Sequence, residues 1–190
     1  MILRSIAILA IGLLAGCAAL PPAAPLARDS IRDFALEARF ALRATPSGQA
    51  PQSANGRLTW VHTEQRDRVL LASPLGYGLA EIDITPQHAT LRTGDGQERE
   101  SADPEELMIA ATGLPLPVAR LPAWLLGRSG HSATIEPDEQ GRPARLSEAG
   151  WQVDYTYDDE RATALPARLT IVRPGEVELK LRIEEWRETP

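Results

Sequence analysis

The residue types that most often do chemistry are scattered through this 190-residue chain. Its three histidines, His62, His88 and His131, lie in or beside predicted strands without the spacing of metal ligands, and we expect His62 and His88 to face solvent. No serine stands in the G-x-S-x-G pattern of a nucleophile elbow, and the Gly-Tyr-Gly tripeptide at 76–78 lacks the third glycine of a phosphate-binding loop. The sequence therefore predicts no metal site and no cofactor, and indicates that the protein is not an enzyme.

Cys17 is the one residue whose position indicates a chemical modification. It follows a positive charge at Arg4, an apolar run over 6–14 and two small residues. An apolar run of that length is too short to span a bilayer and fits a secretory signal peptide. The tetrapeptide Leu-Ala-Gly-Cys at 14–17 resembles the bacterial lipobox. That resemblance implies a diacylglycerol thioether on the Cys17 thiol, cleavage before the cysteine and an N-acyl chain; the alternative is a free cysteine in a signal-anchor helix.

These features divide the chain into a signal peptide over 1–16, a lipidated N-terminus and tether over 17–30, and one domain over 31–190. Two or more acyl chains anchor a protein stably to a membrane. Ala18 stands where an Asp commonly signals retention in the inner membrane, so the expected location is the outer membrane, with the domain facing the periplasm. No later segment approaches about 20 uninterrupted apolar residues.

The charge balance excludes one class of partner. The formal net charge is −6, whereas a nucleic-acid-binding domain has a basic footprint. A single cysteine cannot form an internal disulfide. We therefore expect a monomer without nucleic-acid partners, stabilised by burial of apolar side chains.

Apolar and polar residues alternate with period two along most of the domain, which predicts β-strands. In the clearest run, Val177, Leu179, Leu181 and Ile183 face one way and charged residues face the other. Short links between such runs imply an antiparallel meander, with one face solvated and the other covering an apolar interior. Arg39, Arg43, Arg57 and Arg68 are expected on the solvated face. Eleven strands are predicted: 34–43, 56–62, 67–72, 78–84, 87–93, 96–100, 131–136, 143–148, 150–157, 166–173 and 176–185.

The middle of the chain breaks this pattern and predicts two short helices. Asp103 suits the N-cap of the first, with Pro104 at its first position and an end near Gly113. The second is expected over about 118–126. Two interpretations are open: the pair completes an ordinary core, or it forms a lid over a cavity for an apolar ligand.

A turn at Ser73, Pro74, Leu75 and Gly76 places a large aliphatic side chain at the tip between two predicted strands. Leu75 either folds back into the core or protrudes. Insertion of one leucine into a bilayer contributes about 1.5–3 kcal/mol, which favours contact without anchoring the protein.

The order of these features is similar to that of a known family, the outer-membrane lipoprotein receptor LolB. The resemblance covers essentially the whole mature domain. It is carried, in chain order, by the lipobox ending at Cys17 and by the segments at 67–76, 105–117, 124–127, 151–155, 179–181 and Trp186.

The resemblance implies a mainly β fold: an unclosed antiparallel half-barrel of about eleven strands, with a short helical lid over a hydrophobic cavity, as in LolA and LolB. It also implies that the chain accepts acylated lipoproteins from the periplasmic carrier LolA and inserts them into the inner leaflet of the outer membrane without ATP. Leu75, flanked by Pro74 and Gly76, matches the family's membrane-insertion loop. Candidates for the acyl-chain cavity are Leu58, Trp60, Ile82, Ile84, Leu107, Trp124, Trp151, Val153, Ile171 and Leu181. For each of these, ordinary core packing is the alternative, and a structural outer-membrane lipoprotein with a filled core and no lipid cargo is the alternative function.

Overall fold

One antiparallel sheet of eleven strands forms most of the molecule in the computed structural model, which describes residues 28–45 and 50–187. A short 3-10 helix, Arg28–Ser30, precedes the sheet. The strands are β1 Phe34–Ala44, β2 Gln52–Thr63, β3 Arg66–Ala72, β4 Gly78–Thr85, β5 His88–Thr93, β6 Glu98–Ser101, β7 Thr134–Pro137, β8 Pro143–Glu148, β9 Trp151–Thr156, β10 Arg168–Arg173 and β11 Val177–Arg187.

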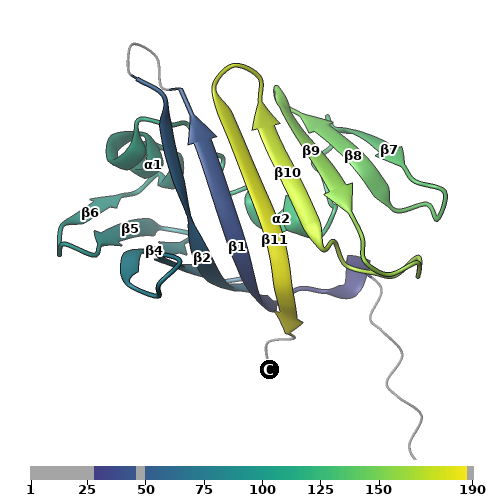
Figure 1. Cartoon of the computed structure of the whole chain (residues 1–190), viewed down its shortest axis with the longest axis horizontal. Coiled ribbons are helices and arrows are strands. Elements are labelled where there is room, and N and C mark those ends of the chain that lie inside the picture. The colour runs from purple at the N-terminus through teal and green to yellow at the C-terminus, as the bar shows by residue number, and fades with distance from the viewer. Residues whose placement is uncertain (1–27, 46–49, 188–190) are drawn as a thin grey trace, which may run out of the picture.

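The order of the strands explains how two halves of the chain make one sheet. It runs β6-β5-β4-β3-β2-β1-β11-β10-β9-β8-β7, so that neighbouring strands are consecutive in the chain except where β1 pairs with β11 (Figure 1). That pair joins the first and last strands of the domain, and Phe40 of β1 lies opposite Leu181 of β11. Because β6 and β7 lie at opposite ends of the order, the sheet is unclosed, which confirms the predicted fold class and the antiparallel meander.

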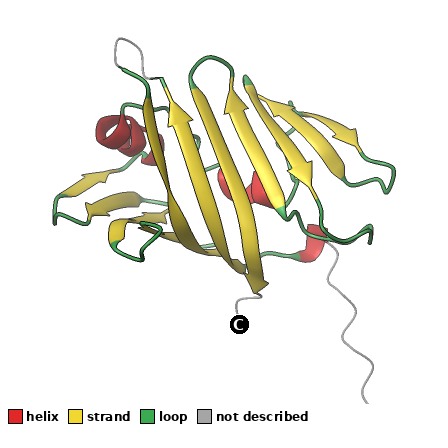
Figure 2. Cartoon of the chain, in the orientation of Figure 1, coloured by secondary structure: helices red, strands yellow, loops and turns green. Residues whose placement is uncertain are grey.

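Alternate side chains along each strand separate an inner from an outer face. In β1, Phe34, Leu36 and Ala38 are buried, whereas Arg39 and Arg43 are exposed on the other side. Both α-helices lie behind the sheet when it is viewed from its outer face (Figure 2). The inner face is therefore the covered one, as the alternation predicts.

The first helix, α1, spans Pro104–Thr112 as predicted. The Asp103 carboxylate accepts hydrogen bonds from the backbone amides of Glu105, at 2.8 Å, and Glu106, at 3.4 Å. Gly113 ends the helix with φ of 73°, a left-handed conformation that glycine adopts without steric cost. The sequence thus specifies both ends of α1 through local chemistry.

The second helix, α2, is shorter than expected and spans only Leu121–Leu125 instead of 118–126. Residues 118–120 form a turn. Pro122 has no amide proton, so it cannot donate the helical hydrogen bond to the carbonyl of Val118, which accounts for the late start. The predicted strand at 131–136 likewise begins later, at Thr134.

Candidate functional site

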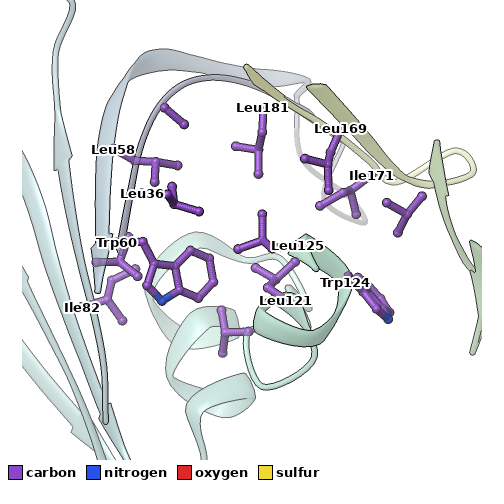
Figure 3. Close-up of a cluster of buried hydrophobic side chains, with 14 of the residues drawn as sticks. Leu36, Leu58, Trp60, Ile82, Leu121, Trp124, Leu125, Leu169, Ile171 and Leu181 are labelled. Carbon is purple, nitrogen blue, oxygen red and sulfur yellow. The ribbon is translucent and has the colours of Figure 1, made fainter. Parts of the chain in front are cut away.

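The inner face of the sheet is lined by apolar side chains from strands of both halves. Leu36, Leu58, Trp60, Ile82, Leu169, Ile171 and Leu181 point from the strands toward Leu121 and Leu125 of α2 (Figure 3). All of them belong to one cluster of buried residues. Because β1 and β11 lie side by side, residues near the two ends of the domain meet in the same interior.

Nine of the ten predicted cavity residues are buried on this inner side, and the tenth, Ile84, is partly buried. Trp124 and Val153 have no exposed surface. These positions therefore belong to one apolar interior. In this structure α2 occupies the space that faces them, so the interior is closed, and contact of these side chains with acyl chains stays a prediction.

Polar contacts fasten α2 to the second half of the sheet. The buried carboxylate of Glu148, at the end of β8, accepts hydrogen bonds from Trp124 Nε1 at 2.8 Å and from the Arg120 guanidinium at 2.9 Å. From β9, the Tyr155 hydroxyl donates a hydrogen bond to the carbonyl of Trp124 at 2.9 Å. Burial raises the pKa of Tyr155, so the hydroxyl stays protonated and keeps donating. We call Arg120, Trp124, Glu148 and Tyr155 the α2 latch.

Sequence reasoning missed the α2 latch, although one signal was present. Glu148 follows Leu146 at the next inward position of β8, where the alternation calls for an apolar residue. Carboxylates are almost never fully buried unless they are paired. An acidic residue at an inward strand position is thus a sign of a buried polar contact.

A second polar cluster lies on the inner face near the start of β1 and corrects an expectation. The Asp67 carboxylate accepts a hydrogen bond from Trp60 Nε1 at 2.7 Å and contacts His62 Nδ1 at 2.7 Å. The ring of Phe34 packs on His62 with centroids 4.9 Å apart. The expectation that His62 faces solvent is wrong, because its even position in β2 shares the inward face with Leu58 and Trp60; His88 is exposed as expected.

The turn between β3 and β4 presents Leu75 to solvent. Its side chain is 84% exposed, so Leu75 protrudes and does not fold back. The Ser73 carbonyl accepts a hydrogen bond from the Gly76 amide, and the Ser73 amide donates to the carbonyl of Tyr77, both at 2.8 Å. Gly76 has φ of 89°, a conformation that disfavours other residues. Two backbone hydrogen bonds within the turn therefore hold its tip in place. Pro74 is exposed as well.

Comparison with known proteins decides the family. A family model described as "Outer membrane lipoprotein LolB" matches residues 32–186, which include the whole sheet apart from one terminal residue, both α-helices and the Leu75 turn. The chain belongs to the LolB family.

Individual relatives of the LolB family match almost the full chain. An outer-membrane lipoprotein LolB from Dechloromonas aromatica (strain RCB) is 62% identical over 188 residues, covering 99% of each chain. One from Azoarcus sp. (strain BH72) is 36% identical over 188 residues, covering 97% of this chain and 94% of the relative. Among solved structures, a DUF1329 family protein from Desulfovibrio piger has a TM-score of 0.50 at 8% identity, covering 85% of this chain and 87% of that one, which is a likeness of fold alone.

The predicted lipidation site of this LolB family member, Cys17, lies outside the described residues. Within the described ranges, no group of three or more His, Cys, Asp and Glu side chains is arranged to hold a metal ion. The helices of the described part of the chain include none long and apolar enough to cross a membrane.

Proposed function

We propose that this chain is an outer-membrane-anchored receptor that accepts lipoproteins from the periplasmic carrier LolA and inserts them into the inner leaflet of the outer membrane. The observation that carries the proposal is the apolar inner face of an unclosed sheet, covered by a five-residue helix, in a member of the LolB family. A covered apolar surface that a small element can uncover suits transient binding of acyl chains.

Hydrophobic transfer supplies the driving force. Each methylene removed from water contributes about 0.8 kcal/mol, so an acyl chain of about fourteen carbons costs roughly 10 kcal/mol when left in water. The receptor binds the chains more tightly than the carrier and more weakly than the bilayer. Handover then runs downhill without ATP and without a catalytic group.

Acceptance of cargo requires α2 to move. The inner side chains of the strands face Leu121 and Leu125 of α2 (Figure 3), so on this proposal an acyl chain reaches them only when α2 withdraws. The α2 latch sets the free energy of that opening. On this proposal, the inner residues of the strands face either α2 or lipid, and core packing and cavity lining are two states of one surface.

Anchoring and location are part of the proposal. Cleavage after residue 16 leaves Cys17 as a lipid-bearing first residue, residues 17–30 form the tether, and 31–190 form the receptor domain facing the periplasm. The proposal includes no enzymatic activity. The alternative is a structural outer-membrane lipoprotein that binds no cargo. Transfer of a labelled lipoprotein from purified carrier distinguishes the two.

The protruding Leu75 is assigned to the delivery step. We expect Leu75→Glu to accept a labelled lipoprotein from purified carrier as the unchanged protein does, but to release little of it into liposomes. A charge at the tip of the turn opposes entry into the apolar part of the bilayer. Transfer is measured with and without liposomes, by separating carrier, receptor and membrane fractions.

A matched control is Ile109→Glu, which places the same charge on another exposed apolar side chain, on α1. It should deliver cargo normally. Normal delivery by Leu75→Glu would remove Leu75 from the mechanism, and failure of the unchanged protein to accept any cargo would support the structural alternative.

A further inference from the structure

Four arginines form a continuous row across the outer face of the sheet. The strand registers pair Arg57 of β2 with Arg39 of β1, Arg39 with Arg182 of β11, and Arg182 with Arg168 of β10. All four are exposed. At a strand spacing of about 4.8 Å, the row extends about 14 Å across the four central strands seen in Figure 1. We call these residues the arginine row.

The arginine row is only partly neutralised. Arg39 pairs with Glu184 at 2.6 Å and Arg168 with Asp158 at 2.8 Å, whereas Arg57 and Arg182 have no ion pair within the described part of the chain. Like charges directly opposite each other on neighbouring strands are destabilising. A row of three such pairs therefore lowers the stability of the free protein and attracts an anion.

Three residues of the arginine row border a depression in the outer face. Arg39, Arg168, Arg182 and Lys180 lie around a hollow of about 240 Å³, in which Ala41 and Thr170 flank Lys180 on neighbouring strands. Small side chains on either side of the lysine keep the hollow open. Guanidinium groups bind phosphate oxygens through two parallel hydrogen bonds, so this arrangement suits phosphate groups.

An apolar surface continues from one end of the arginine row. Arg57 lies opposite Ala72, the last residue of β3, and the Leu75 turn follows directly. Three more large apolar side chains are exposed around this turn, with Tyr77 72% exposed and Leu70 and Leu79 each 42% exposed. Leu70 alternates with the inward Val69, which places it on the same outer face as Arg57, and Leu79 lies at the register shift where Ala72 pairs with Gly78.

We propose that the outer face of the sheet docks on an anionic phospholipid bilayer, with the arginine row binding headgroup phosphates while Tyr77 and Leu79 enter the interface beside Leu75. Cations next to exposed apolar side chains are the combination that holds proteins at membrane surfaces. An acidic protein would match the arginines but not the apolar turn, so the membrane is the partner favoured. The proposal rests on the proposed function, because it defines how the anchored receptor faces the bilayer that it serves.

The test measures the orientation of the full, lipidated chain on vesicles. Because the chain has one natural cysteine, Cys17, which the proposed function places under lipid, Asn55→Cys supplies a single labelling site on the outer face, two residues from Arg57. A fluorophore at this site is quenched by headgroup-labelled lipid when the outer face docks. We expect quenching on phosphatidylcholine vesicles that contain phosphatidylglycerol, and its loss at high salt, because salt screens exposed charges.

Replacing the two arginines without carboxylate partners, Arg57→Gln with Arg182→Gln, should lower the docked-to-undocked ratio about twenty-five-fold, at roughly fivefold per arginine. The matched control, Arg32→Gln with Arg161→Gln, removes the same charge from exposed positions outside the sheet and should leave the ratio unchanged. Thermal unfolding shows that each variant is folded, and the first pair should be at least as stable as the parent because it removes like-charge contacts.

Three results overturn the docking proposal. The first is quenching that does not depend on phosphatidylglycerol or salt. The second is an equal loss of quenching in both double variants. The third is a loss of cargo acceptance from the carrier in the Arg57/Arg182 variant while quenching is unchanged. The last result would assign the arginine row to a protein partner. Cargo acceptance in the absence of membranes reports on the proposed function separately, so a failure of docking leaves that function standing.

Discussion

Glu148 shows how one residue position controls the interior. Its carboxylate is only 6% exposed and serves two donors from the helix segment, Trp124 Nε1 and the Arg120 guanidinium. A buried carboxylate loses its hydration, and only its hydrogen-bond partners compensate for that loss, so these partners are energetically important. Glu148 therefore supplies two of the polar contacts that hold α2 against the sheet.

Glu148→Gln should lower the free energy of unfolding by about 2 kcal/mol, because it replaces charge-assisted hydrogen bonds in a buried site. It should also speed uptake of a fluorescent fatty acid, since α2 is held less firmly. Urea denaturation and probe-binding kinetics measure the two effects. The control Glu98→Gln breaks an exposed ion pair with Arg92 and should cost no more than about 1 kcal/mol. Equal effects of the two substitutions would refute the role given to the latch.

At the scale of elements, the two helices differ in how they are held. Local capping fixes α1, with Asp103 at its start and Gly113 at its end. α2 has no side-chain cap at its start and only five residues, so its stability comes from Trp124, Leu125 and the polar latch. A helix of this length is not stable by itself in water. α2 is therefore the element best suited to uncover the inner face.

Asp103→Ala should destabilise the domain by about 1 kcal/mol, through loss of the cap on the amides of Glu105 and Glu106. Hydrogen exchange should accelerate in the first turn of α1 and not in α2. Asp103→Asn retains a capping oxygen and should behave nearly as the parent protein in both measurements. If alanine and asparagine have the same effect, the negative charge, rather than the cap, is what stabilises α1.

For the whole molecule, the separate roles of the proposed anchor and of the domain can be tested. The sheet and both α-helices lie within residues 34–187, outside the proposed anchor. We expect Cys17→Ala, exported by another signal, to accept cargo from the carrier at close to the normal level. Transfer of a labelled lipoprotein in solution measures this. Loss of acceptance together with the lipid would show that the anchor, and not the domain, binds the cargo.

Much of this protein follows from local patterns in its sequence. Alternation in segments such as 177–184 predicts both a strand and the face it buries, because side chains on a strand point alternately to opposite sides. Asp103, Pro104 and Gly113 predict the limits of α1 through backbone hydrogen bonding. The tetrapeptide at 14–17 that resembles a lipobox and the Ser73–Gly76 turn are equally local, and the order of such features indicates the LolB family.

The tertiary structure alone decided what depends on contacts between distant segments. Period-two patterns give the face of Arg39, but only the pairing of β1 with β2 and β11 sets it between Arg57 and Arg182. The same holds for Glu148, whose burial depends on α2 lying against it. Strand neighbours and helix docking are chosen by the packing of the whole interior, a property that no single segment carries.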